Sequence, residues 1–117
     1  MADAALFIGF GEVVRGREKR ALRTYENSME YWSGLQKEGK IASFDVTLLG
    51  PHANLNGFVI VRGTDEQLDA VRHSKEFRRQ MARTRLIVDQ MVVAEAFVGS
   101  QIAEFMNQYQ EEVDQLD

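Results

Sequence analysis

The fold of this chain is decided by residues 41–62, which read IASFDVTLLGPHANLNGFVIVR. Two runs rich in β-branched and aromatic residues, 41–49 and 55–62, flank a loop that contains one Gly-Pro and one Asn-Gly pair. Runs of this composition are typical of strands, and the Gly-Pro and Asn-Gly pairs are typical of the connection between them. The stretch therefore predicts two successive strands in the middle of the chain.

Strand and helix patterns continue on both sides of this stretch. Apolar residues at three- and four-residue steps predict helices, and a Ser or Thr before such a run predicts the helix start. The second helical region changes phase near His73-Ser74, which predicts a break there with Ser74 as the cap of a new helix. The remaining predicted elements are a strand at 5–14, a helix at 17–37, a broken helix from Thr64, a strand at 90–98 and a final helix from Ser100.

This order of elements is that of a ferredoxin-like α+β fold. A βαββαβ chain forms a four-stranded antiparallel sheet whose two main helices cover one face, because crossover connections are right-handed. We expect one domain over residues 1–117, with a ferredoxin-like core at about 5–99 and an additional helix at 100–117. The other face of the sheet is then left open.

The alternation of side chains along each strand predicts which residues lie on that open face. In the last strand, Val92, Ala94, Ala96 and Val98 form an all-apolar set, small enough to let a helix approach. We therefore assign this set to the helix-covered face. The residues expected on the open face are Phe7, Gly9, Asp45, Thr47, Val59, Val61, Val93, Glu95 and Phe97. A surface this apolar usually marks an interface, and here we expect it to pair with a second copy of the chain.

Composition limits the kinds of chemistry that the chain can perform. The absence of cysteine excludes disulfides, thiolate catalysis and Cys-ligated zinc. A formal charge of −4 gives no general attraction to nucleic acid or to anionic membranes. The first residues lack the basic and apolar regions of a secretory signal, and no apolar run reaches the ~18 residues of a membrane helix. We expect a cytoplasmic protein with no membrane partner, no metal and no cofactor.

The whole pattern resembles the dimeric α/β-barrel superfamily. The resemblance rests on a first strand rich in Phe and Gly, a first helix that bears Trp32, the paired runs in 41–62, a broken second helix and a fourth strand. It covers about residues 5–99. Members of that group pair two ferredoxin-like sheets face to face, and they include small monooxygenases, isomerases and haem-handling proteins. The resemblance implies a homodimer with a ligand cavity at the sheet.

Glu95 is the first candidate for a catalytic residue. A carboxylate between Val93 and Phe97 on one strand face would be desolvated, as general bases often are. The alternative is that Glu95 lies at the rim of the barrel and pairs with an arginine or with solvent. His73 is a second catalytic candidate, because it lies four residues after Asp69 on a helix. The predicted break at Ser74 favours a solvated histidine instead.

Four further residues are candidates for ligand binding, because they belong to the same expected face as Glu95: Asp45, Thr47, Phe7 and Phe97. Our leading hypothesis is that the chain binds a small organic molecule at the sheet, and the sequence leaves open whether it also turns this molecule over. The alternative is a non-catalytic dimerisation or regulatory module. A basic stripe formed by Arg72, Lys75, Arg79 and Arg83 raises nucleic-acid binding as a third hypothesis, which the acidic chain and the lack of an RNA-binding aromatic signature disfavour.

Overall fold

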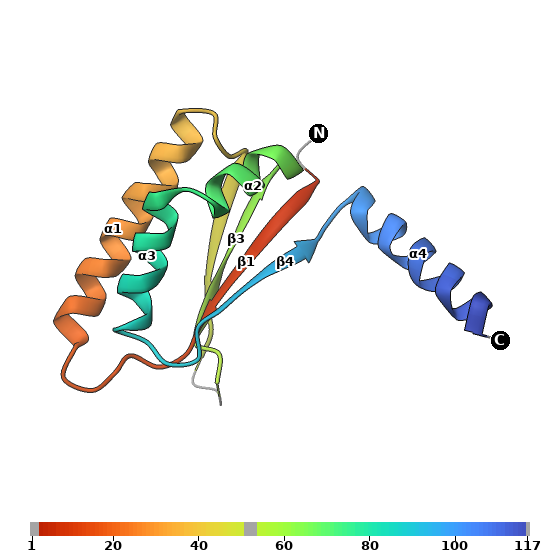
Figure 1. Ribbon diagram of the computed structural model, residues 1–117. Coiled ribbons are helices and arrows are strands. Elements are labelled where there is room, and N and C mark those ends of the chain that lie inside the picture. The colour runs from red at the N-terminus through yellow and green to blue at the C-terminus, as the bar shows by residue number, and fades with distance from the viewer. Residues whose placement is uncertain (1–2, 51–53, 117) are drawn as a thin grey trace.

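The computed structural model describes residues 3–50 and 54–116. Figure 1 shows a layer of helices on one side of a sheet, while the C-terminal helix stands away on the other side. In chain order the elements are β1 (Ala4–Phe10), α1 (Glu18–Lys37), β2 (Ser43–Leu48), β3 (Gly57–Gly63), α2 (Asp65–Arg72), α3 (Lys75–Arg85), β4 (Val92–Phe97) and α4 (Ser100–Leu116). The strands lie in the order β2-β3-β1-β4, and all neighbours are antiparallel. The predicted ferredoxin-like α+β architecture is confirmed.

The helix boundaries follow the local signals in the sequence. Thr64 and Gln67 form a reciprocal capping box that begins α2, with Gln67 N donating to Thr64 Oγ1 at 3.1 Å. The predicted break at residues 73–74 is confirmed, since Phe77 N donates to Ser74 Oγ at 3.2 Å and α3 begins there. Gly39, with a φ of +73°, follows the end of α1 in the left-handed conformation that glycine adopts without strain.

The hydrophobic core lies between the sheet and helices α1, α2 and α3. Leu6 and Val61 at the centre of the sheet are completely enclosed, as is Trp32 on α1. Trp32 packs edge-on against Phe77 of α3, with ring centroids 6.2 Å apart. Burying three such side chains contributes roughly 5–9 kcal/mol of hydrophobic free energy. This core fixes which face of each strand turns toward the helices.

The strand register corrects the expected composition of the open face. Residues directly opposite one another in an antiparallel pair share a face of the sheet. Leu6 and Ile8 face the helices, and their partners therefore face the same way: Val61 and Glu95 opposite Leu6, and Val59 and Val93 opposite Ile8. Phe97 pairs with Ala4 and belongs to the same set. The prediction that Val59, Val61, Val93, Glu95 and Phe97 lie on the open face was wrong.

The error has a physical cause. In β3 both alternating sets are apolar, so alternation alone cannot orient the strand. In β4 we gave the all-apolar set to the covered side, but β4 is an edge strand and the helix layer leaves its covered side partly open. An exposed Glu95 is therefore tolerated there, while Ala94 and Ala96 lie on the open face opposite Phe7 and Ala5.

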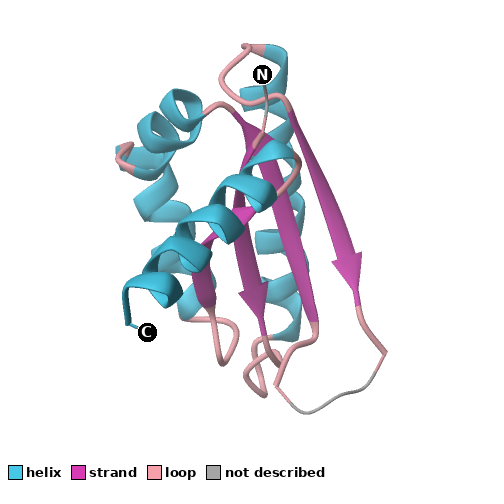
Figure 2. Ribbon diagram, turned by 90° about the vertical axis from the view of Figure 1, so that its right-hand side faces the viewer, coloured by secondary structure: helices cyan, strands magenta, loops and turns pink. Residues whose placement is uncertain are grey.

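The open face itself is strongly apolar. The placement of Phe7, Gly9, Asp45 and Thr47 on it is confirmed by the register, which sets them opposite Phe58 and Ile60 of β3. The rings of Phe7 and Phe58 stack with centroids 5.4 Å apart. Phe7 also lies over Gly9, where an added Cβ would meet the ring at 2.7 Å. In Figure 2 this face is turned toward the viewer, with α4 passing in front of it.

Candidate functional site

An apolar hollow lies on the helix side of the sheet, beneath α1 and α3. We call it the helix-side cavity. Its volume is about 580 Å³, within the range of sites for small organic ligands. Its floor comes from the sheet, its walls come from the two helices, and the segment after α3 closes one end. Ala21 and Ser28 of α1, Thr84 of α3 and Asn56 before β3 are among the residues that line it.

The lining of this cavity is almost uncharged. Among the described residues that form it, Glu18 alone carries a charge, and its Oε2 accepts a hydrogen bond from Gly16 N at 3.3 Å, at the start of α1. Most of the wall is aliphatic, aromatic or methionine side chain. Because an ion transferred to such surroundings would lose its hydration without gaining a partner, the cavity suits a neutral, largely apolar molecule.

The few polar groups near the cavity partner one another. Gln80 is only 5% exposed, and its Oε1 accepts from Ser28 Oγ at 3.5 Å. Thr84 Oγ1 donates to the Gln80 carbonyl oxygen at 2.8 Å. Asn56 Oδ1 is different, because it is buried at the cavity wall and has no hydrogen-bond partner within residues 3–50 and 54–116. The cavity therefore offers a small number of fixed polar positions in an apolar wall.

The mouth of the cavity exposes large apolar side chains to solvent. Leu22 is 69% exposed and Leu48 is 66% exposed, and Val13 and Tyr25 beside them are also exposed. Single exposed apolar residues are ordinary on protein surfaces, but four around one opening form a patch. Tyr25 and Leu22 of α1 thus lie at the rim of the cavity rather than in the core.

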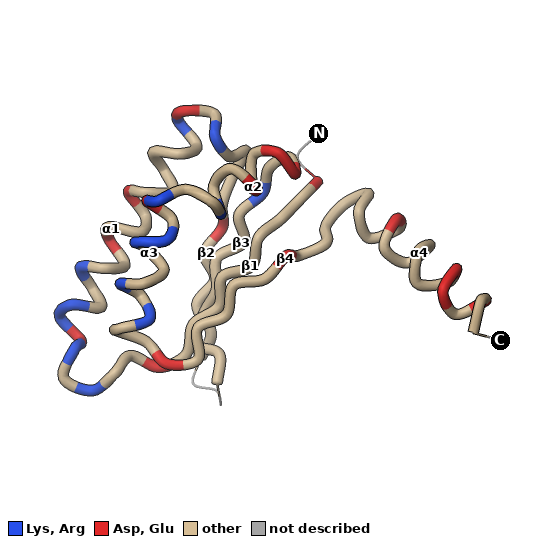
Figure 3. Tube along the Cα trace, viewed as in Figure 1, with Lys and Arg blue, Asp and Glu red and all other residues tan. Residues whose placement is uncertain are grey.

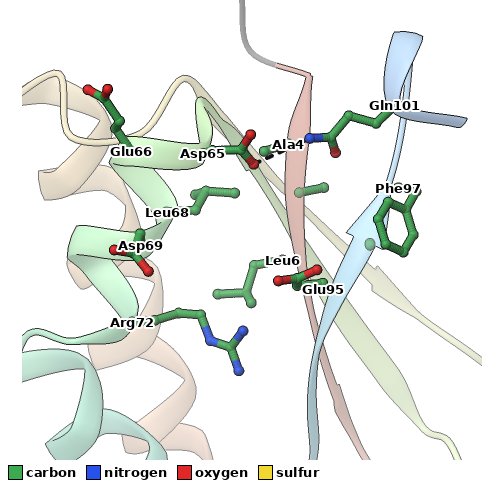
Figure 4. A pocket seen from close by; sticks show the side chains of 12 residues that line it. Ala4, Leu6, Asp65, Glu66, Leu68, Asp69, Arg72, Glu95, Phe97 and Gln101 are labelled. Carbon is green, nitrogen blue, oxygen red and sulfur yellow. Dashed lines mark hydrogen bonds between the residues drawn. The ribbon is translucent and has the colours of Figure 1, made fainter. Parts of the chain in front are cut away.

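A second, smaller pocket lies between α2 and the edge strand β4 and is drawn in Figure 4. Its volume is about 360 Å³ and its lining is charged. Arg72 from α2 and Glu95 from β4 extend toward one another across it, yet no ion pair joins them within residues 3–50 and 54–116. A hydrogen bond does join two other residues that line this pocket, because Gln101 Nε2 donates to Asp65 Oδ1 at 3.3 Å.

The candidate residues of the sequence divide between separate places. Glu95 and Phe97 line the charged pocket, and Glu95 is exposed, so the desolvation on which its base role was argued is missing. Phe97 packs against Phe105 of α4 with ring centroids 4.6 Å apart. Phe7, Asp45 and Thr47 lie on the open sheet face. The structure therefore does not bring the six predicted site residues together.

His73 lies at the end of α2, exposed and outside the three pockets described for the chain. Its Nδ1 lies 2.8 Å from the carbonyl oxygen of Asp69, to which it can donate, and 3.4 Å from the Asp69 carboxylate. No group of three or more His, Cys, Asp or Glu side chains in the described ranges is arranged to hold a metal ion. His73 thus caps the C-terminal end of α2, with Asp69 as its acidic neighbour.

Tyr31 is the titratable group whose environment is most clearly altered. Burial raises the pKa of its phenol above the ordinary value of 10.0; a hydrogen bond with Ser74 lowers this pKa, and the negative charge of Glu76 raises it. Tyr31 lines a third pocket, which lies between α1 and α2. It therefore remains a neutral hydrogen-bonding group at physiological pH.

Sequence reasoning missed the polar residues of the helix-side cavity. One signal was available: Gln80 and Thr84 recur at a four-residue step in the same helix as Phe77 and Met81, so a glutamine stands among core positions of α3. A buried glutamine needs hydrogen-bond partners, and this requirement points to polar groups on the facing helix. The contribution of the sheet and of Asn56 could not be found in this way.

Comparison with known proteins supports the fold and nothing finer. No family model and no curated protein matches the chain. Among solved structures, PA3566 from Pseudomonas aeruginosa is similar with a TM-score of 0.62 and 11% identity, over 86% of this chain and 97% of that one. A dimeric protein of unknown function and ferredoxin-like fold from Bacteroides fragilis NCTC 9343 gives a TM-score of 0.59 and 10% identity, over 81% of this chain and 96% of that one.

Both structures share the ferredoxin-like fold with this chain, and the likeness spans nearly the full length of each. At such low identity the shared fold assigns no reaction. In addition, none of the described helices combines the length and the apolar character needed to cross a membrane.

Proposed function

We propose that this chain is a homodimeric small-molecule-binding protein, in which each subunit holds a neutral, largely apolar organic molecule in the helix-side cavity. The observation that carries the proposal is the apolar lining of a cavity of about 580 Å³ whose mouth is ringed by exposed apolar side chains. A soluble ligand that covers this rim removes it from water, and about 25 cal/mol is gained for each Å² of apolar surface buried. Glu95 and His73 are not part of this site.

The open sheet face supports the dimeric part of the proposal. Phe7, Phe58 and Ile60 form its centre, and Ala94 and Ala96 continue it onto β4. A contiguous apolar surface of this kind is unfavourable in water unless another surface covers it. The similar protein from Bacteroides fragilis is described as dimeric, and it has the same fold. Pairing of two open faces would leave both helix-side cavities accessible from outside.

Binding to the cavity can be tested with N-phenyl-1-naphthylamine, an uncharged apolar dye whose fluorescence rises in apolar surroundings. Ala21 of α1 lines the cavity, so Ala21→Phe places a ring in the space that the dye would occupy. We expect this variant to lower dye affinity at least about tenfold, a loss of roughly 1.4 kcal/mol. Ala82→Phe on the exposed side of α3 is the matched control and should bind like the unaltered chain.

Two results would contradict the proposed site. One is equal dye affinity for Ala21→Phe, Ala82→Phe and the unaltered chain, which would place the dye elsewhere. The other is the absence of dye binding to the unaltered chain at any concentration up to the solubility of the dye. Circular dichroism of each variant establishes that a loss of affinity is not a loss of fold.

A further inference from the structure

Helix α4 has an apolar face that no part of the chain described by the structure covers. None of the residues of α4 is buried, and its large apolar side chains are exposed, namely Ile102, Phe105, Met106, Tyr109 and Leu116. Within residues 3–50 and 54–116 the helix is held at its base: Ser100 Oγ donates to Asp3 Oδ2 at 2.6 Å, Gln101 Nε2 donates to Asp65 Oδ1 at 3.3 Å, and Phe105 packs against Phe97. In Figure 1 the rest of α4 extends away from the sheet on the side opposite the other helices.

The size of the molecule shows how much surface this arrangement leaves exposed. The accessible surface is 8160 Å², whereas a folded monomer of this mass exposes about 6,450 Å². The radius of gyration is 16.2 Å, against about 13 Å for a compact chain of this length. The excess of about 1,700 Å² is larger than the roughly 800 Å² that each partner buries in a standard interface, so the exposed surface is large enough to form one.

The charges on α4 indicate that it is not stable by itself. Its charged residues are all acidic (Glu104, Glu111, Glu112 and Asp114), and three of the four lie in its C-terminal half. Negative charge near a helix C-terminus opposes the helix dipole, and short isolated helices are only marginally stable in water. The helix therefore needs packing, or cations, from another surface.

The same charges limit what that surface can be. Two α4 helices packed on each other would bring acidic residues together, with no lysine or arginine on either helix to balance them. The body of the chain is different, as Figure 3 shows, because basic residues gather along α1 and α3. Those of α3 are Lys75, Arg78, Arg79, Arg83 and Arg85, all exposed. An acidic, apolar helix thus complements the body of a second copy.

From these observations we propose that α4 is an exchanged arm, whose apolar face packs against the body of the second copy in the homodimer. The inference rests on the homodimer proposed above and adds the residues that hold it together. Because α4 stands on the open side of the sheet, a second copy that covers the open face enters the space between the sheet and α4 (Figures 1 and 2). The second copy then covers both the apolar face of α4 and the open sheet face.

The test compares two lysine substitutions on opposite faces of α4. Tyr109→Lys places a charge on the apolar face, and Asn107→Lys places the same charge on the polar face as the matched control. The dissociation constant of the dimer is measured by sedimentation velocity across concentrations from nanomolar to micromolar. We expect Tyr109→Lys to raise this constant at least about tenfold, because the loss of a tyrosine from an interface often weakens binding by this much. Asn107→Lys should change the constant less than about threefold.

The absence of native cysteine allows a second, direct measurement. The variant Gln115→Cys is prepared without isotope labelling, and a nitroxide is attached to its cysteine. This protein is mixed with ¹⁵N-labelled chain that carries no nitroxide. Contact of the arm with the partner predicts broadening of ¹⁵N amide signals in the second copy. If only signals of the spin-labelled chain broaden when that chain is itself ¹⁵N-labelled, α4 closes on its own sheet and the proposal is overturned.

The outcomes separate this inference from the proposed dimer. An unaltered chain that is monomeric at all concentrations would remove both the dimer and the exchanged arm. A stable dimer whose dissociation constant is the same for Tyr109→Lys and Asn107→Lys, without broadening in the partner, would leave the sheet-paired dimer standing and overturn the arm alone.

Discussion

The helix-side cavity and the open sheet face are both apolar, but they differ in shape and in what can cover them. The cavity is a hollow of about 580 Å³, bounded by α1, α3 and the sheet and open to solvent at its mouth. The open face is one side of a four-stranded sheet, and α4 stands in front of it. A hollow of this size fits a small molecule, whereas a broad sheet face fits another protein surface. Both surfaces are apolar, so hydropathy alone does not distinguish a ligand site from a protein interface, whereas the shape of each surface does.

The largest effect is expected from a charge at the centre of the open face. Phe58→Lys removes the stack with Phe7 and places an ammonium group in the proposed dimer interface. A buried, unpaired charge is strongly unfavourable, so we expect the dissociation constant of the dimer to rise at least about a hundredfold. Dye affinity of the helix-side cavity should stay within about threefold. Sedimentation velocity and dye titration measure the two quantities.

Leu86→Lys is the matched control for that substitution. Leu86 follows α3, is 65% exposed and does not belong to the sheet. It should leave the dimer intact. If Leu86→Lys and Phe58→Lys weakened the dimer equally, the open face would not be the interface. If Phe58→Lys abolished dye binding while the protein remained folded, the two apolar regions would be one site.

A smaller effect is expected from Tyr31, which lies on the helix side but outside the cavity. Because burial raises the pKa of the folded phenol above 10.0, the folded state holds this proton more tightly than the unfolded state does. The resulting stability is fully present below pH 10 and is lost as the pH rises through the folded pKa. Urea unfolding at pH 8 and pH 11 should show a larger decrease in free energy for the unaltered chain than for Tyr31→Phe.

Tyr31→Phe lacks an ionisable group at this position, so it provides its own control for the other tyrosines. An equal decrease in both proteins would show that Tyr31 contributes nothing to the alkaline loss of stability. Dye affinity at pH 8 should be the same in both, because Tyr31 does not line the helix-side cavity.

The smallest effect is expected from Glu95→Gln. Glu95 lines the charged pocket beside α2 and belongs neither to the helix-side cavity nor to the open face. Dye affinity and the dimer dissociation constant should each change less than about twofold. A tenfold fall in dye affinity would move the binding site from the helix-side cavity to the charged pocket and restore Glu95 as a ligand-binding residue.

Much of the fold could be predicted because its signals are local. The capping box at Thr64, the break before Ser74 and the apolar periodicity of α1 each depend on residues within one or two helical turns. The order of these elements then leaves few topologies, since crossover handedness is fixed. The candidate site was not predictable in the same way, because its walls come from β1, α1, β3 and α3, which are distant in the sequence.

The sequence by itself determined the element order, the ferredoxin-like architecture and the presence of an apolar sheet face with Phe7, Asp45 and Thr47 on it. Only the tertiary structure decided the orientation of β3 and β4. Val59 and Val61 are as apolar as Phe58 and Ile60, so either face of β3 could have turned inward. The pairing with Leu6 and Ile8 resolved that choice, and it moved Glu95 from the expected ligand face to the edge of the helix layer. Register is the pairing of residues between strands that are distant in the sequence, so it cannot be predicted from the alternation within one strand.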